Sequence, residues 1–356
     1  MKINPEKAAV AAGLRYVHDD MPGIRRRRWG KGFSYILPSG DRLSSSPKSG
    51  SSEAKIRNRI DSLAIPPNWE DTWICLDPNG HLQSTGRDGK GRKQYRYHPE
   101  WRKFRNLQKF DKMVPFGECL PELRSQTASD LKVPRLSRRK VTAAAVQLLD
   151  RTLIRVGNAQ YAQRNKSYGL TTLRDRHVDF DRDQLNFHFV GKSGIEHDIT
   201  IEDPRLAKVV RACRDIPGYE LFQYYDEAGY RQTLGSGDVN DYLKRVTGED
   251  FTAKDFRTWA GTVVATDMLA QLGDWAKESE AKSNVVVAIK AAAAQLGNRP
   301  ATCRKYYVHP TVPENYLAGD LLMQIAEAKR QQQSKDLQQW LADHEQGVLG
   351  VLKLAS

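Results

Sequence analysis

The spacing of apolar residues predicts a strand-rich first part of the chain. Short apolar runs alternate with polar residues in "FSYIL" and in "DTWICLDPNGHLQSTGRD", where two runs flank a Pro-Asn-Gly turn, and again in "GRKQYRYH". Residues 39–52 are rich in Ser, Gly and Pro and predict a flexible loop. The segment "SEAKIRNRIDSLAI" has helical spacing and stops before Pro66. Residues 1–97 are therefore expected to form a small antiparallel sheet domain.

Helical spacing dominates from residue 98 onward, with one strand-rich island inside it. The stretch "RKVTAAAVQLLDRTLIRVG" predicts a long apolar helix that ends at Gly157. Three alternating runs follow, "HVDFD", "QLNFHFV" and "IEHDITI", and "GKSG" between the last two predicts a tight hairpin with Lys192 at its tip. Residues 314–356 predict two helices separated by the polar "KRQQQSKD". We expect an α+β fold whose second, mainly α-helical domain spans residues 98–356, with a helical tail over 311–356.

The charge of the chain points to a partner. Lys and Arg number 56 and Asp and Glu 43, so the formal net charge is +13 over 356 residues. An excess of this size favours a polyanion, most often nucleic acid, although a basic protein without that role stays open. The runs "RRRR" (25–28) and "RDGKGRK" (87–93) would add phosphate contacts that do not depend on base sequence. A solvated charged segment is the alternative for the arginine run.

Cysteine usage and hydropathy favour a soluble intracellular protein. The four cysteines are far apart, with no CxxC pair and no metal spacing with histidine, so we expect free thiols in a reducing compartment and no metal. No apolar run approaches the roughly 20 residues of a membrane helix. The first residues lack the apolar core of a signal peptide. We therefore expect a cytoplasmic location and no contact with a membrane.

Several residues suit phosphate chemistry, and each also has an ordinary interpretation. Arg155 near the end of the predicted apolar helix can meet an anion or extend its charged end to water. Lys192 can reach a DNA groove or be a solvated turn residue. Arg257 in "KDFRTWAGT" can be a surface residue of an amphipathic helix. The segment "GNRPATCRKYYVHP" predicts a helix that carries both tyrosines, and both can simply pack in a core.

Taken together, these residues resemble the active site of the type IB DNA topoisomerases, in particular the small poxvirus enzymes and their bacterial relatives. The spacings agree, with 37 positions from Arg155 to Lys192 and nine from Asn298 to Tyr307. The surrounding segments "RVGN", "SYGLTTLRDRHV", "FVGKSG", "KDFRTW" and "GNRPATCRKYY" also match. The segment from "IPPNWEDTW" to "YRYHPEW" resembles the amino domain of the bacterial members. The resemblance runs from about residue 14 to about residue 310.

The resemblance implies a bilobed DNA clamp, in which a helical catalytic domain with a three-stranded sheet faces the N-terminal sheet. It also implies that Tyr307 attacks a DNA phosphodiester, displaces the 5′ oxygen and forms a 3′-phosphotyrosyl link. The free strand end then swivels, releases supercoils and is rejoined. The covalent link keeps the bond energy, so no ATP is needed, in line with the lack of a GxxxxGK[ST] loop. No metal or other cofactor is expected, because arginine and lysine supply the positive charge.

Chemistry assigns a role to each matched residue. Arg155 and Arg257 suit the non-bridging phosphate oxygens because guanidinium is planar, bidentate and always charged. Asn298 stands where poxvirus enzymes carry histidine, and since an amide cannot transfer a proton it should only stabilise charge. Lys192 is the better general acid for the leaving oxygen, because arginine is too weak an acid. Lys254 either assists or only holds a phosphate, and the sequence shows no general base.

The strand "GRKQYRYH" resembles the strand that small topoisomerases lay against DNA. Carried over, Gln94, Tyr95 and Tyr97 are DNA contacts, with Lys93 beside them. Glutamine can read adenine in the major groove, and tyrosines can pack on sugars or thymine methyl groups. The two tyrosines share one face of a strand, so a buried sheet face is the alternative. We expect double-stranded DNA as the partner of a monomeric, nucleoid-associated enzyme without an obligatory protein partner.

The tyrosine pair and the protein class each leave a choice. Neighbouring residues on a helix point about 100° apart, so only one tyrosine can face the phosphate, and the spacing from Asn298 selects Tyr307 over Tyr306. A tyrosine recombinase shares the same catalytic logic, but it usually has His-x-x-Arg where this chain has Lys254-x-x-Arg257. A non-catalytic DNA-binding protein is the third possibility.

Overall fold

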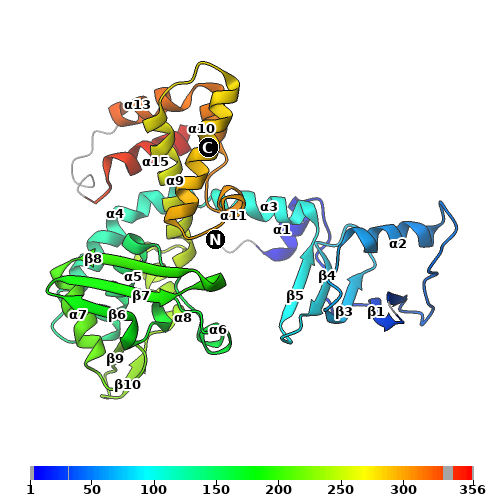
Figure 1. The fold of residues 1–356 in the computed structure, drawn as a ribbon, viewed down its shortest axis with the longest axis horizontal. Helices are drawn as coiled ribbons and strands as arrows, with labels where there is room; N and C mark the ends of the chain where they lie inside the picture. Colours follow the sequence, from blue (N-terminus) through cyan, green and yellow to red (C-terminus); the bar gives the residue numbers. More distant parts are fainter. Residues whose placement is uncertain (1–3, 31, 332–339, 355–356) are drawn as a thin grey trace. The chain divides into compact units, whose positions relative to one another are not determined.

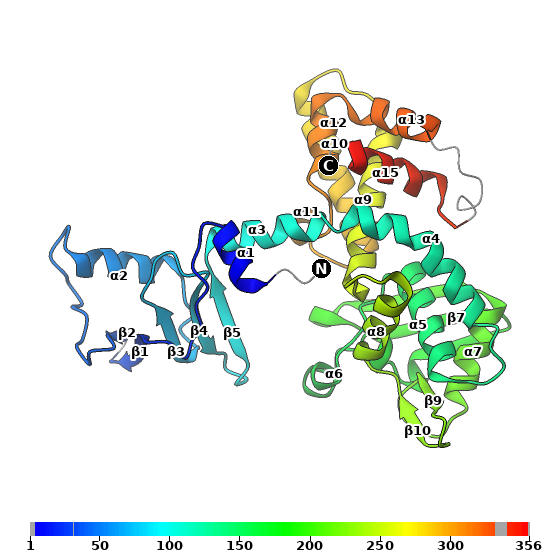
Figure 2. The ribbon, with the colours of Figure 1, turned by 180° about the vertical axis from the view of Figure 1, so that it is seen from behind.

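The computed structural model describes residues 4–30, 32–331 and 340–354 and divides the chain into two compact units, residues 1–110 and 111–356 (Figures 1 and 2). The first unit is built around an antiparallel sheet and the second around helices with a separate sheet, so the predicted α+β class is confirmed. Helix α3 (Pro99–Phe110) groups with the first unit. A functional boundary at residues 97 and 98 stays a prediction.

The first unit contains a five-stranded sheet in the order β2-β1-β3-β4-β5, with every neighbouring pair antiparallel. The strands are β1 (Gly23–Trp29), β2 (Gly32–Ile36), β3 (Glu70–Cys75), β4 (Leu82–Arg87) and β5 (Lys93–Tyr97), and the helices before α3 are α1 (Pro5–Ala11) and α2 (Ser52–Ser62). Ile24 and Ile74 of the sheet pack against Ile60 of α2, which explains the helical spacing of apolar residues in that segment.

The arginine run forms strand β1 and is not a uniform phosphate-binding segment. Arg26 is half-buried, and one of its amino groups donates to the carbonyls of Pro66 (2.9 Å) and Trp69 (2.7 Å). Its guanidinium also lies 4.2 Å from the ring centre of Phe33. The prediction of phosphate contacts is therefore wrong for Arg26, because the side chain is used inside the unit. The other three arginines of the run are exposed.

The second unit surrounds a three-stranded antiparallel sheet, β6-β7-β8, with helices. The strands are β6 (Val178–Asp181), β7 (Gln184–Val190) and β8 (Glu196–Glu202). The helices are α4 (Met113–Asp130), α5 (Arg138–Thr152), α6 (Ala159–Asn165), α7 (Pro204–Arg214), α8 (Ser236–Thr247), α9 (Ala253–Leu272), α10 (Glu278–Gln295), α11 (Pro300–Tyr306), α12 (Thr311–Ala318), α13 (Leu321–Gln331) and α15 (Asp343–Leu354). Figures 1 and 2 show α5 and α7 on one face of this sheet.

Two details of the second unit differ from expectation. A short hairpin of β9 (Gln223–Tyr225) and β10 (Arg231–Thr233) was not predicted. The tail has three helices within the described residues, α12, α13 and α15, where two were expected. The predicted polar linker starts as the end of α13, and its remainder from residue 332 lies outside the described residues. Within the described chain, every helix is too short or too polar to cross a membrane.

Helix α9 is the central element of the second unit. It is buried on several faces, as expected for a helix that is apolar nearly all round, and it packs against α4, α5, α10 and α15. Trp259 of α9 donates its indole N–H to Glu345 of α15 at 2.9 Å, and Arg124 of α4 donates to the same carboxylate at 2.7 Å. Burial alone would raise the pKa of Glu345, but Arg124 outweighs it and holds that pKa below its ordinary value.

Candidate active site

Arg155 lies in an extended segment just after α5, whereas the sequence predicted that the helix would continue to Gly157. The helix ends because Leu153 adopts a left-handed conformation (φ 57°), in which its N–H still donates to Leu149. Beyond it, the carbonyl of Arg155 accepts from the N–H of Leu170 at 2.8 Å. This bond fixes the backbone of Arg155, and its half-buried side chain extends toward the turn after α10.

Arg257 is buried inside α9, with only 4% of its surface exposed. Its two amino groups donate to the carbonyl of Leu153, at the end of α5, and to that of Leu296 at 2.6 Å, at the end of α10. Carbonyls at helix ends lack partners within their own helix and attract positive charge. Burial, and then the nearby charge of Arg155, lower the pKa of Arg257 to about 10, which leaves the group charged at neutral pH. The alternative prediction, that Arg257 is a surface residue of an amphipathic helix, is therefore wrong.

Asn298 follows α10 and is held by Arg155. The guanidinium of Arg155 donates to Oδ1 of Asn298 at 2.5 Å. Because guanidinium can only donate, this contact fixes the orientation of the amide and leaves Nδ2 as the free donor. That Nδ2, like Nε of Arg257, is buried and has no hydrogen-bond partner among the described residues. The site therefore contains two buried N–H groups without an acceptor.

Tyr307 is the first residue after α11, and Tyr306 is the last residue of that helix. The expectation that the helix carries both tyrosines is thus wrong, and the two have different surroundings. The Tyr307 ring centre lies 5.4 Å from the guanidinium carbon of Arg257, and the two side chains share a hydrogen bond. Tyr306 instead lies against Lys305, whose ammonium is 5.4 Å from its ring centre.

The backbone of Tyr307 is fixed by two residues of α9 that the sequence reasoning did not single out. The hydroxyl of Thr262 donates to the Tyr307 carbonyl at 3.3 Å. Gly261 lies against the same carbonyl, so a methyl group at that position would be only 2.6 Å from the oxygen. Both residues lie within the segment "KDFRTWAGT", about one helical turn after Arg257. That position is the signal by which the sequence could have identified them.

Two of the predicted lysines lie at the surface. Lys192 occupies the tip of the β7–β8 hairpin, in a tight turn over Lys192–Gly194, as predicted, and its side chain is exposed. Lys254 is also exposed, in the first turn of α9. The structure thus brings together Arg155, Arg257, Asn298 and Tyr307, and leaves the two lysines accessible.

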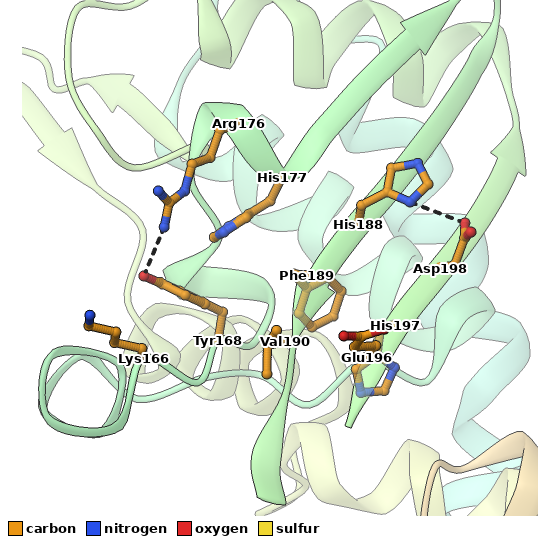
Figure 3. A pocket seen from close by; sticks show the side chains of 10 residues that line it. All are labelled: Lys166, Tyr168, Arg176, His177, His188, Phe189, Val190, Glu196, His197 and Asp198. Carbon is orange, nitrogen blue, oxygen red and sulfur yellow. Dashed lines mark hydrogen bonds and ion pairs between the residues drawn. The ribbon is translucent and has the colours of Figure 1, made fainter. Parts of the chain in front are cut away.

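His197, on β8, is a residue that the sequence reasoning missed. It lines an open cavity of about 620 Å³ together with Tyr168, His177 and His188 (Figure 3). Its ring stacks on Phe189 at 4.8 Å between ring centres, with 14° between the planes. Burial, and then the charges of Arg155 and Arg257, lower the pKa of His197, so the imidazole is mainly neutral at neutral pH. The sequence offered no signal, because His197 is only one polar position in an alternating strand.

The predicted polar DNA contacts of the first unit are paired with acids. Lys93 forms an ion pair with Asp19 at 2.6 Å. Gln94 donates from Nε2 to Asp88 at 2.9 Å, which leaves its carbonyl oxygen and its second N–H. These two groups form the donor–acceptor pair that can match adenine in the major groove.

The predicted tyrosine contacts lie on one face of β5. Tyr95 and Tyr97 stack with 5.8 Å between ring centres and 8° between their planes. Tyr95 is 46% exposed, whereas Tyr97 packs against a core that contains Trp73 and Leu82. Tyr95 is therefore accessible to a ligand, and the buried-face alternative holds in part for Tyr97.

Comparison with known proteins agrees with this arrangement. The family described as eukaryotic DNA topoisomerase I, catalytic core, matches residues 98–337, and the bacterial DNA topoisomerase IB N-terminal domain matches residues 32–88. DNA topoisomerase 1B of Acanthamoeba polyphaga mimivirus is 33% identical over 259 residues, which cover 70% of this chain and 76% of the relative. DNA topoisomerase 1B of Vaccinia virus (strain Copenhagen) is 22% identical over 248 residues, or 69% of this chain and 75% of the relative. The chain therefore belongs to the type IB DNA topoisomerase family.

Proposed function

We propose that this chain relaxes supercoiled double-stranded DNA by cutting and rejoining one strand, with Tyr307 as nucleophile and a 3′-phosphotyrosyl intermediate, without ATP or a metal ion. The observation that carries this proposal is the pair of buried donors without a described acceptor, Nδ2 of Asn298 and Nε of Arg257, whose guanidinium lies beside the Tyr307 ring. A buried polar group without a partner costs about 1–3 kcal/mol. A site that keeps two such donors is prepared for an acceptor that arrives with the substrate.

The non-bridging oxygens of the scissile phosphate are suitable acceptors. Arg257 and Arg155 supply positive charge, and Asn298 supplies a neutral hydrogen bond from the same side. Negative charge grows on these oxygens as the phosphorus becomes five-coordinate, so donors fixed in advance stabilise the transition state more than the bound substrate. The carbonyls of Leu153 and Leu296 hold Arg257 in place, so little reorganisation is needed when DNA binds.

The proton needed by the leaving oxygen comes from Lys192 in this proposal. The Tyr307 hydroxyl loses its proton to solvent as its oxygen forms a bond to phosphorus, the bond from phosphorus to O5′ breaks, and Lys192 protonates O5′. Its exposure at a hairpin tip supports this role, because the side chain can enter a groove of the bound duplex. Lys254, exposed on α9, is assigned a supporting phosphate contact.

The first unit is proposed to hold the other side of the duplex. Gln94, Tyr95 and Tyr97 of β5 would contact bases and sugars, and Lys93 would contact phosphate after leaving Asp19. The net charge of +13 supports association with the nucleoid in the cytoplasm. The chain is proposed to act there as a monomer. Light scattering of the purified protein, alone and with a short duplex, tests the monomer, and a dimer in both conditions would contradict it.

The enzyme assignment is tested on supercoiled plasmid with EDTA and without ATP. We expect the parent and Tyr306→Phe to relax many plasmids per enzyme molecule, and Tyr307→Phe to bind DNA without relaxing it. The reverse result for the two tyrosines would contradict the choice of nucleophile. Recombined products, or relaxation only with paired specific sites, would favour a tyrosine recombinase.

A trapped covalent adduct then identifies the linkage. A duplex labelled at one end or the other is incubated with excess enzyme, denatured and digested, and the modified peptide is sequenced. We expect Tyr307 attached to a 3′ phosphate. A 5′ linkage would overturn the mechanism, and binding without any adduct would favour a non-catalytic DNA-binding protein.

A further inference from the structure

The hairpin that carries Lys192 has a close neighbour outside its own turn. Gly191, next to Lys192, donates its N–H to the carbonyl of Ile195 at 2.7 Å and closes the hairpin. His197 lies directly against Gly191, so a methyl group on Gly191 would be 2.6 Å from Nε2 of the imidazole. The imidazole also stacks on Phe189, its cross-strand partner (Figure 3). The base of the hairpin therefore rests on a ring whose own position is fixed.

The same imidazole contacts the turn that carries Asn298. A methyl group on Gly297 would lie 3.3 Å from Cε1 of His197 and 4.0 Å from Nε2. Gly297 precedes Asn298, and its φ of 56° favours glycine, so the backbone there approaches the ring without an intervening side chain. His197 thus fills the space between two glycines, one beside Lys192 and one beside Asn298.

We propose that His197 is a positioning residue, which fixes the Lys192 hairpin against the Asn298 turn so that the lysine reaches the leaving oxygen. The inference rests on the proposed role of Lys192 as general acid. A general acid must come within about 2.6–3.2 Å of the oxygen that it protonates. A misplacement of about 1 Å can cost about 10²-fold in rate. Without the ring, the hairpin keeps the bond from the N–H of Tyr168 to the carbonyl of Val190 at 2.9 Å, but it loses the contact of the imidazole with both Gly191 and Gly297.

A sulfur substitution in the DNA tests this role. The scissile phosphate is prepared with its normal bridging O5′ or with sulfur in that position. Thiols are much stronger acids than alcohols, with a pKa of about 8.5 for cysteine, so a thiolate leaves without a proton from the enzyme. Single-turnover cleavage is measured at saturating enzyme for the parent, Lys192→Ala, His197→Ala and His197→Phe. His188→Ala, which removes an exposed histidine of β7 from the same cavity, is the matched control.

We expect His197→Ala to cleave the oxygen substrate about 10²-fold more slowly than the parent, and to cleave the sulfur substrate at close to the parent rate. Lys192→Ala should show the same pattern. His197→Phe keeps a flat ring between the glycines and should stay within a few-fold of the parent on both substrates. His188→Ala should be unchanged on both.

The outcomes separate this inference from the proposed function. If sulfur rescues Lys192→Ala but not His197→Ala, the positioning role is wrong and the general acid stands. If sulfur rescues neither variant, the general-acid role of Lys192 is wrong and the positioning role falls with it. If His197→Phe is as slow as His197→Ala, the imidazole nitrogens take part in the chemistry, and a purely positioning role is overturned.

Discussion

Replacing Asn298 by aspartate should make the free protein more stable and the enzyme much slower. The change keeps the acceptor that Arg155 uses at 2.5 Å and removes the buried Nδ2 donor that has no partner among the described residues. Hydrogen bonds to charged groups contribute about 1.5–3 kcal/mol, against about 0.5–1.5 kcal/mol for neutral ones. Because Arg155 is only half-buried, we discount this difference to a net gain of about 1 kcal/mol.

The expected loss of activity is larger than the gain in stability. Removal of one donor to a developing oxyanion typically costs about 10²–10³-fold in rate, or about 2.7–4 kcal/mol. The new carboxylate oxygen would also face the phosphate and repel it. Asn298→Asp should therefore reduce single-turnover cleavage by at least about 10²-fold and raise the Tm of the catalytic unit by about 2–4 °C.

Both quantities can be measured on the same preparations. Cleavage is followed as covalent adduct on a labelled duplex at several enzyme concentrations, which separates the rate of chemistry from DNA affinity, and Tm is measured without DNA. Asn315→Asp, which adds the same charge on α12 where the amide bonds with Gln324, controls for net charge. Asn298→His should retain most activity, because it restores a donor. Cleavage by Asn298→Asp within threefold of the parent would refute the idea that Nδ2 contacts the phosphate.

Other predictions rest on separate contacts. Gly261→Ala should slow single-turnover cleavage by about 10²-fold with unchanged DNA affinity, because its methyl group would lie 2.6 Å from the Tyr307 carbonyl oxygen. Gly237→Ala is the control: a methyl group there has nothing within 4 Å, so this variant should match the parent in the same assay. Glu345→Gln should lower the free energy of unfolding by about 1–3 kcal/mol at neutral pH. Pairing with the arginine of α4 holds the pKa of Glu345 below its ordinary range, so this stabilisation is present above the unfolded pKa and is lost as pH falls through the folded pKa. Urea unfolding at acid pH should therefore show a smaller difference between Glu345→Gln and the parent. A difference that does not change with pH would contradict the ion pair. Asp19→Asn frees the candidate DNA-contacting lysine of β5 and should tighten binding to any duplex at low salt, as measured by anisotropy; weaker binding would show that the ion pair presents that lysine correctly.

The elements that the sequence predicted well are those with local causes. The alternating runs around "GKSG" predict a hairpin with Lys192 at its tip, and Lys192 lies there in the structure. The order and spacing of the active-site residues were available only through the family resemblance. Their burial was not predictable, since Arg257 is enclosed by carbonyls from α5 and α10, and both lie far from it in sequence.

The errors arose where distant contacts override local preference. Leucine rarely adopts a left-handed conformation, so nothing in the apolar run indicated that α5 would stop at Leu153. Its carbonyl accepts from Arg257, a contact between distant segments that the local sequence does not indicate. His197 was missed for the same reason. Its contact with Gly297 joins segments that are far apart in the sequence, and a strand pattern shows only which face a residue occupies.

Helix α15 is made after almost all the rest of the described chain, yet it packs against α4 and α9 in the middle of the catalytic unit. Ribosomes add about 5–20 residues per second, and the N-terminal parts fold first. Until α15 emerges, Trp259 and Arg124 lack Glu345, and α9, which holds Arg257, has one uncovered side. A chain made only as far as α13 therefore carries the candidate catalytic residues on an incomplete core. The ability to break DNA should therefore arise only after α15 has been made and has packed against α4 and α9.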